Sequence, residues 1–233
     1  MPSRVEAALL AAVFALAALV FTLWPQLDLQ ITGLFFSAQD GFALDRLAVV
    51  KAIYWGVWGG SRLAVITVIL LWLASFVVRN GWLATRRRWF GFLALAFALG
   101  PGLIADAGLK NHWGRARPHQ IEAFGGTRHF TPALAPAAEC DRNCSFVSGH
   151  ATGAFALMAF GWLAAPRRRA LWLGIAAVSG TVVGFVRVIQ GGHFASDVVF
   201  AFYAVWLGCW LASTILRRVG WLPAGEQIPA TLR

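Results

Sequence analysis

Long apolar runs constrain this chain more than any other feature of its sequence. An α-helix of about 20 apolar residues can cross about 30 Å of hydrocarbon. With 59% hydrophobic residues, 13% charged residues and a mean hydropathy of +0.66, the chain lies outside the range of ordinary soluble proteins. The sequence therefore predicts an all-α, polytopic membrane protein, a bundle of six transmembrane helices. The six runs are 5–24, 64–78, 89–107, 151–165, 171–189 and 194–216.

Arginine clusters give the predicted bundle an orientation. They follow the second, fourth and sixth runs, within 79–88, 167–169 and 217–218. Because Lys and Arg in short loops favour the cytoplasmic side, both termini are expected in the cytoplasm. The polar segment 108–147 and the Gly191-Gly192 pair then fall on the opposite side. The same arginines explain the net charge of +10, so that anionic lipid is the expected neighbour and nucleic acid is not.

The remaining segments are short. Residues 25–60 mix charged residues with apolar clusters, which is typical of helices that lie in the membrane interface; the second run is expected from residue 64, or from shortly before Arg62. The sequence has no internal repeat and no low-complexity segment. One domain, 1–218, is therefore expected, followed by a polar cytoplasmic tail, 219–233.

Three ionisable residues, Arg187, His193 and Asp197, lie within a strongly apolar stretch near the end of the chain. Ionisable residues in membrane segments usually mark a functional site. If the chain is helical from Phe194, the carboxylate of Asp197 lies on the same face as the imidazole and accepts its Nδ1 proton, which leaves the other ring nitrogen free to attack. A guanidinium beside such an imidazole favours a phosphorylated substrate. The alternative is a histidine at a helix end, capped by a nearby acid.

A second pair of cations is expected on the same side of the membrane. Lys110 and Arg117 are seven residues apart, so a helix that continued to Pro118 would present both on one face. Two fixed cations can hold a phosphate. The alternative is that both side chains reach towards the membrane interface without binding a ligand.

The third group precedes the fourth apolar run. Ser148 and Gly149 offer a hydroxyl and a free backbone N–H at a helix N-terminus, which is a favourable place for an anion. His150, in the first helical turn, is then positioned to protonate a leaving oxygen. The alternative is a plain N-cap, with His150 as an ordinary first-turn residue.

Together these motifs resemble the three-part signature of the type 2 phosphatidic acid phosphatase superfamily. They are Lys-x6-Arg-Pro at 110–118, Ser-Gly-His at 148–150 and Arg-x5-His-x3-Asp at 187–197. The resemblance extends through the six-span layout to cover residues 1–218. The superfamily also contains soluble vanadium-dependent haloperoxidases that share the pocket, but an apolar body favours a lipid substrate.

The resemblance implies a membrane lipid phosphatase that works through a phosphohistidine. His193 would be the nucleophile, oriented by Asp197, and His150 the acid that protonates the leaving alkoxide. Because positioning and charge neutralisation carry most of phosphoryl-transfer catalysis, the phosphate-binding residues replace a metal, and no metal or cofactor is expected. The phosphate-binding residues would be Lys110, Arg117, Ser148, Gly149 and Arg187.

Two positions depart from the family's usual pattern. Val147 stands where proline usually precedes the serine, and Val186 stands where serine usually precedes the arginine. Neither change removes a proton-transfer group. The changes therefore bear on substrate preference, and an active enzyme is expected.

The loop 112–150 is similar to the lipid A 1-phosphatase branch of the superfamily. The similarity rests on 112–120 (HWGRARPHQ), 124–126, 130–132 and 140–150 (CDRNCSFVSGH). The expected reaction is removal of the 1-phosphate of lipid A at the periplasmic face of the bacterial inner membrane. Undecaprenyl diphosphate and phosphatidylglycerol phosphate are the alternative substrates. Four loop residues are expected to cover a large anionic headgroup: Arg115, Arg128, His129 and Arg142.

The cysteines support a periplasmic loop. Cys140 and Cys144 share this loop, where an oxidising compartment favours a disulfide. A zinc site that includes His119 and His129 is the alternative. Cys209, in the last apolar run, is expected to be a packing residue.

A membrane transporter for anions or lipids is the competing function. It would explain ionisable residues in membrane helices, but it predicts charges near the midplane of several spans. The interiors of the first three runs carry none. The sequence therefore favours a phosphatase, with a phosphorylated membrane lipid as its partner.

Overall fold

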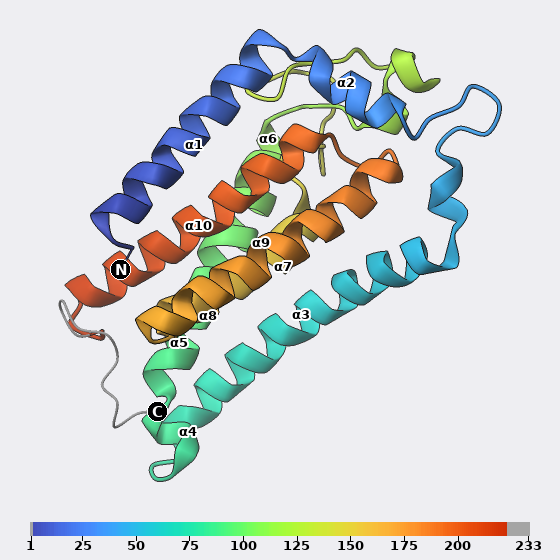
Figure 1. The fold of residues 1–233 in the computed structure, drawn as a ribbon. Coiled ribbons are helices and arrows are strands. Elements are labelled where there is room, and N and C mark those ends of the chain that lie inside the picture. The colour runs from blue at the N-terminus through green and yellow to red at the C-terminus, as the bar shows by residue number, and fades with distance from the viewer. Residues whose placement is uncertain (1, 223–233) are drawn as a thin grey trace.

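The computed structural model describes residues 2–222, and its regular structure in this range is helical, with only isolated β-bridges. Five helical segments are long and apolar enough to cross a membrane (Figure 1). The protein is therefore an all-α, polytopic membrane protein, as predicted. The five segments are α1 (Arg4–Leu23), α3 (Ala48–Val77), the continuous run Arg87–His112, α9 (Pro166–Ile189) and α10 (Ala195–Arg218).

The fourth expected span, 151–165, is a shorter, buried helix. It consists of α7 (Gly149–Phe155), η5 (Ala156–Met158) and α8 (Ala159–Leu163). At 1.5 Å per residue it measures roughly 22 Å, less than the hydrocarbon thickness. Its buried face contributes to the main apolar core, together with α5, α9 and α10. The count of six spans is therefore not confirmed.

The second span begins earlier than expected. α3 starts at Ala48, so the interpretation of 48–60 as part of an interfacial segment was wrong. A mid-helix arginine does not interrupt α3, because the Arg62 guanidinium donates to the Trp58 carbonyl at 2.9 Å and lies 3.8 Å from the centre of its ring. The shorter elements outside the long helices are α2 (Gln26–Gly33), η1 (Ala43–Arg46), α4 (Trp82–Thr85), η3 (Pro118–Gln120) and η4 (Glu122–Phe124).

The third span changes its winding part-way. It consists of α5 (Arg87–Phe97), the π-helical stretch η2 (Ala98–Leu109) and α6 (Lys110–His112). Pro101 lies inside η2; proline lacks a backbone N–H and disrupts regular α-helical hydrogen bonding. η2 also crosses α10 closely: a Cβ atom on Gly208 would lie only 2.3 Å from the Cα of Gly100. This crossing sets the position of α10, which carries Asp197.

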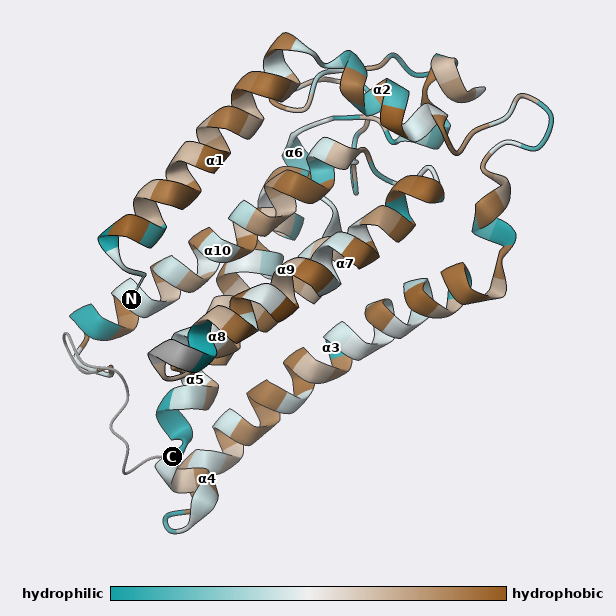
Figure 2. Cartoon of the chain, viewed as in Figure 1, coloured by the Kyte–Doolittle hydropathy of each residue, from teal (hydrophilic) through white to brown (hydrophobic). Residues whose placement is uncertain are grey.

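The two ends of the bundle differ in composition. The α4 loop, the start of α9 and the end of α10 lie at one end, whereas α2, α6 and the start of α10 lie at the other (Figure 1). The arginine clusters therefore share one end, as predicted. Figure 2 shows apolar residues along the long helices and hydrophilic residues mainly in loops and at helix ends.

Lipid is the natural neighbour of the long helices. α1 buries none of its residues, and its exposed apolar side chains include Leu9 and Leu16. So large an apolar surface is expected against a membrane. Residues 223–233 of the predicted cytoplasmic tail lie outside the described residues.

Candidate active site

His193 and Asp197 meet at the N-terminus of α10. The helix begins at Ala195, and Asp197 in its first turn accepts the N–H of Phe194 at 2.8 Å. The His193 Nδ1 atom lies 3.5 Å from Oδ2 of Asp197, and both side chains are buried. This distance is longer than a normal hydrogen bond, and Nδ1 has no other partner among residues 2–222. The predicted proximity of the imidazole and the carboxylate is nevertheless present.

The environment of His193 favours a neutral ring. Burial lowers the pKa of the His193 imidazole well below its ordinary value, and the carboxylate of Asp197 opposes this effect. The nearby cations Lys110 and Arg117 lower the pKa further. A neutral imidazole carries the lone pair that a nucleophile needs.

The Gly191-Gly192 pair turns the chain between Arg187 and His193. Gly191 has a left-handed φ of 64°, and the N–H of Gly192 donates to the Arg187 carbonyl at 2.9 Å. A Cβ atom on Gly192 would lie 2.2 Å from a terminal nitrogen of Arg187. Glycine is therefore needed for the guanidinium to lie against this turn.

Lys110 joins the first motif to the second. Its side chain is buried, and its Nζ donates to the Cys144 carbonyl at 3.4 Å. A Cβ atom on Gly149 would lie 3.7 Å from the same Nζ, so the ammonium group lies beside the start of α7. Ser148 is the N-cap of that helix, and its own N–H donates to the Asp197 carbonyl at 3.1 Å. Segments from all three motifs thus contact one another.

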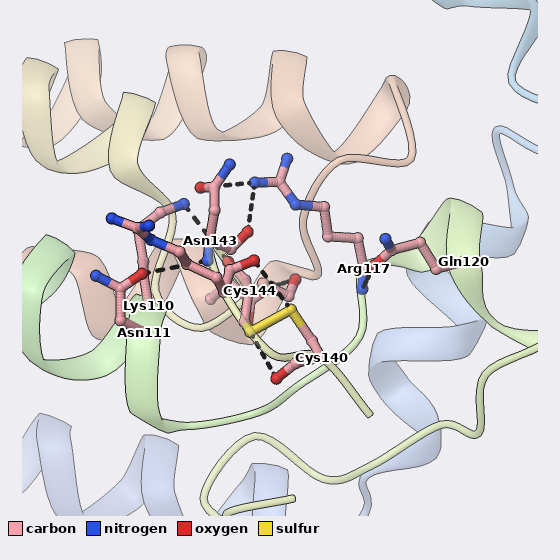
Figure 3. The surroundings of a disulfide bond; sticks show 10 residues. Lys110, Asn111, Arg117, Gln120, Cys140, Asn143 and Cys144 are labelled. Carbon is pink, nitrogen blue, oxygen red and sulfur yellow. Dashed lines mark hydrogen bonds between the residues drawn. A yellow bond between two sulfur atoms is a disulfide. The ribbon is translucent and has the colours of Figure 1, made fainter. Parts of the chain in front are cut away.

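Arg117 reaches the site by a different route from the one predicted. The helix ends at His112, and Arg117 has extended backbone angles, so the expectation that it shares a helical face with Lys110 was wrong. The chain turns at Gly114, whose φ is 70° and where a Cβ atom would lie 1.7 Å from the Ala137 carbonyl oxygen. Arg117 then donates to the Asn143 carbonyl and side chain, at 2.8 and 3.0 Å (Figure 3).

A disulfide between Cys140 and Cys144 closes the loop that holds Asn143 (Figure 3). The predicted disulfide is present, and because both sulfurs are bonded they cannot serve as zinc thiolates. The Cys144 N–H donates to the Lys110 carbonyl at 2.8 Å, which ties the loop to the end of the third span. Cys209 is buried and unpaired, as expected of a packing residue.

His150 lies in the first turn of α7, as predicted. Its ring stacks on Tyr54, with centroids 4.3 Å apart, and its Nε2 has no hydrogen-bond partner among the described residues. The Arg187 guanidinium also lies over the Tyr54 ring, 4.7 Å from its centre. Tyr54 therefore supports two predicted site residues, a role that its position at the start of α3 did not reveal in the sequence.

Asp197 is also held by residues that the three motifs do not specify. Arg115 donates to its Oδ1 at 2.6 Å and to Oδ2 of Asp28 at 2.8 Å, and its side chain is completely buried. The Ser145 hydroxyl donates to the second oxygen of Asp197. The expectation that Arg115 covers a headgroup was therefore wrong. Asp28 could have been noticed as an acid within an apolar segment, but nothing in the sequence indicates its partner.

The other three proposed covering residues, Arg128, His129 and Arg142, are exposed at the same end of the molecule. The departures Val147 and Val186 are buried among apolar side chains; Val186 packs in a cluster with Val50.

The sequence profile of the PAP2 superfamily matches residues 89–221, more than half of the chain. The chain belongs to the PAP2 superfamily. This PAP2 protein is a phosphatase, a phosphoric monoester hydrolase, so the predicted enzyme class is confirmed and the transporter alternative is set aside.

Curated relatives of this PAP2 protein are lipid A phosphatases. A lipid A 4'-phosphatase of Francisella tularensis subsp. novicida (strain U112) is 36% identical over 85% of this chain and 90% of its own length. One of Rhizobium leguminosarum is 30% identical over 84% of this chain and 87% of its length. A lipid A 1-phosphatase of Rhizobium etli is 35% identical over 48% of this chain and 44% of its length. No solved structure matches.

Proposed function

We propose that this PAP2 phosphatase removes the 4'-phosphate of lipid A. The observation that supports the position is the extent of similarity. Relatives named lipid A 4'-phosphatase match 84–85% of the chain, whereas the one named lipid A 1-phosphatase matches 48%. The proposal replaces the 1-phosphate expected from the loop alone.

The proposed nucleophile is Nε2 of His193, because Nδ1 faces Asp197. Its lone pair forms the N–P bond while the bond from phosphorus to the lipid oxygen breaks. His150 gives a proton to that leaving oxygen. Water then attacks the phosphohistidine, with His150 taking a proton from the water, and inorganic phosphate leaves as the N–P bond breaks.

The proposed phosphate cradle combines side-chain cations with a helix N-terminus. Lys110, Arg117 and Arg187 would neutralise the phosphoryl oxygens, and Ser148 and the Gly149 amide would donate from the start of α7. Such fixed donors stabilise the charge of the transition state without a metal ion. A bound phosphoryl group would also offset the repulsion between these cations and a protonated His150.

We place this site at the periplasmic face of the inner membrane, within a single domain, 1–218, that has both ends in the cytoplasm. The arginine clusters at the opposite end of the bundle support this orientation. The disulfide in the site loop supports an oxidising compartment.

The test is phosphate release by the purified protein in the presence of EDTA. Lipid A, phosphatidylglycerol phosphate and undecaprenyl diphosphate are compared, with His193→Ala as the inactive variant and His112→Ala, an exposed histidine outside the site, as the control. We expect release from lipid A that His193→Ala abolishes and His112→Ala retains. Phosphorus NMR of the product identifies the phosphate that remains.

Loss of the 1-phosphate would overturn the proposed position. Release from another lipid alone would overturn the proposed substrate. Full activity of His193→Ala would overturn the proposed nucleophile, and a requirement for a metal that EDTA removes would overturn the metal-free cradle.

A further inference from the structure

A cavity of about 570 Å³ lies beside the proposed phosphate site. It is bounded by the segment before α3, the first turns of α3 and the turn after α9. Arg187 of the phosphate site also lines this cavity, as do Gly192, in the turn before His193, and Tyr54, which stacks on His150. Cavities of about 300–1,000 Å³ hold ligands larger than a phosphate group. The cavity therefore has room for the part of a substrate that adjoins the phosphate.

Two cations in this cavity have no partner in the described protein. Arg46 and Lys51 line the cavity and are exposed, and neither side chain forms a hydrogen bond or ion pair with another residue of 2–222. Lys51 is one of only two lysines in the sequence, and the other is Lys110 of the proposed phosphate site. Guanidinium and ammonium groups in such a position suit a second anionic group on the same ligand.

The rest of the lining suits a sugar. The Asp40 and Asp45 carboxylates line the cavity, and carboxylates accept hydrogen bonds from hydroxyl groups. The Trp55 ring, also in the lining, is 60% exposed and offers an apolar face. A simple phosphate site would need neither carboxylates, which repel phosphate, nor an open aromatic face. The combination matches a sugar headgroup better than a bare anion.

Hydrogen bonds connect this cavity to the proposed phosphate site. The Gln190 side-chain amide donates to Asp45, and its carbonyl oxygen accepts from the Arg187 guanidinium. A headgroup seated against Asp45 would therefore act on the orientation of Arg187. Arg187 in turn lies over the ring on which His150 stacks.

We propose that this cavity is a subsite for the sugar headgroup of the substrate, in which Arg46 and Lys51 bind a second phosphate. The inference rests on the proposed function, because the names of the relatives place lipid A phosphates at two positions, 1 and 4'. One phosphate would lie against His193 while the other contacts the two cations. The enzyme would then prefer a bisphosphorylated lipid to one that carries only the phosphate to be removed.

The test compares kcat/KM for three lipids in detergent micelles: lipid A with both phosphates, lipid A with only the 4'-phosphate, and phosphatidic acid. The variant is Arg46→Gln with Lys51→Gln, and the matched control is Arg79→Gln with Arg88→Gln, two exposed arginines at the opposite end. We expect the wild type and the control to prefer the bisphosphorylated lipid by about tenfold, or about 1.4 kcal/mol. The variant should lose this preference through a higher KM, with little change on the singly phosphorylated lipid.

An equal ratio in the wild type and the variant would overturn the subsite. A uniform loss of activity on all three lipids would also overturn it, because cations that only attract the membrane surface would act on every lipid alike. Failure of the proposed function would look different, because the wild type would then release no phosphate from lipid A that carries only the 4'-phosphate, even if it removed the 1-phosphate from the form with both.

Discussion

Arg115 connects three segments that are distant in the sequence. Its guanidinium bridges Asp28 of α2 and Asp197 of α10, and it donates to the Ser196 hydroxyl as well. All of these side chains are buried. Burial raises the pKa of Asp28, and the charge of Arg115 opposes that rise. The arrangement holds Asp197 in place, and one cation lies against the two buried carboxylates and offsets their negative charge.

Arg115→Met should therefore destabilise the protein strongly. The variant leaves two buried carboxylates without their shared cation, and the expected loss is about 3–5 kcal/mol. Thermal unfolding in detergent measures it. Arg128→Met, which removes an exposed arginine, should unfold close to the wild-type temperature, and an equal shift in both variants would contradict the role of the buried network.

Asp197→Asn should lower turnover by at least about 100-fold. The amide keeps the shape of the side chain but loses the negative charge that faces the imidazole. The proposed phosphate cradle is on other residues, so inhibition by inorganic phosphate should survive. Comparing kcat with the inhibition constant for phosphate tests this, and parallel loss of both would mean that Asp197 acts mainly by holding the fold.

The pH profile should be bell-shaped, with its acidic limb below pH 6.5. His193 must be neutral to attack, and because burial lowers its pKa, the ring stays neutral until the pH falls through that lowered value. His150 must be protonated to act as the acid, which gives the alkaline limb. Burial and the nearby cations lower the pKa of the His150 imidazole to about 3 without ligand, and a bound phosphoryl group opposes the effect of the cations. The measurement is therefore kcat against pH, which reports the substrate complex. His150→Gln should lose the alkaline limb, and an acidic limb above pH 6.5 would contradict the neutral His193.

At the scale of the helices, one crossing sets the geometry of the site. Gly208 of α10 lies against Gly100 of η2, the π-helical stretch that contains Pro101. Small residues allow such close approach of two helices in a membrane. Because α10 begins beside His193, a shift of α10 at this crossing would also move Asp197.

Gly208→Ala should lower both stability and activity. The new methyl group would lie 2.3 Å from the Cα of Gly100, and the overpacking should cost about 1–3 kcal/mol. Gly174→Ala is the matched control, because a Cβ atom there meets nothing within 4 Å and alanine favours the helix. Thermal unfolding and phosphate release are measured together; unchanged stability of Gly208→Ala would contradict the tight crossing.

At the scale of the whole molecule, α6 and the start of α10, which adjoin the site, lie at one end of the bundle, and the α4 loop, the start of α9 and the end of α10, which carry the arginine clusters, lie at the other (Figure 1). Basic loops favour the cytoplasm, so the site should face the periplasm. The disulfide removes two of the three cysteines from thiol chemistry, and the third is buried. A cysteine introduced on the surface can therefore be labelled without interference from the native cysteines.

Thiol labelling in intact cells should show this orientation. A cysteine at the exposed position Thr127, Thr127→Cys, should react with a membrane-impermeant maleimide. Asn80→Cys, exposed at the arginine-rich end, should react only after the membrane is permeabilised. The reverse pattern would place the site in the cytoplasm.

Several features could be predicted from local sequence. Long apolar runs indicate membrane helices for two reasons. Lipid hydrocarbon is compatible only with an apolar surface, and a helix forms the hydrogen bonds of its own backbone internally. The spacing of His193 and Asp197 indicated that the two lie close together, and they do. His193 itself precedes the helix, and Asp197 reaches back from the first turn to the N–H of Phe194. The Gly191-Gly192 turn also follows from local conformational freedom.

Other features depend on packing between distant segments. The start of α3 was missed because Lys51 interrupts the apolar run, whereas its exposed side chain lies in the first turn of the helix and does not end it. The route of Arg117 was missed because its chain leaves the helix at a turn around Gly114. The broken helix 149–163 looked like an ordinary span, because hydropathy does not distinguish a lipid-facing helix from a buried one.

The sequence by itself determined that this is a helical membrane protein and which residues carry its family signature, because hydropathy and short spacings act along the chain. Only the tertiary structure decided that Asp28 and Arg115 hold Asp197, that Tyr54 supports His150 and Arg187, and that a cavity lies beside them. Those contacts join residues far apart in sequence, and packing of the whole bundle is what brings them together.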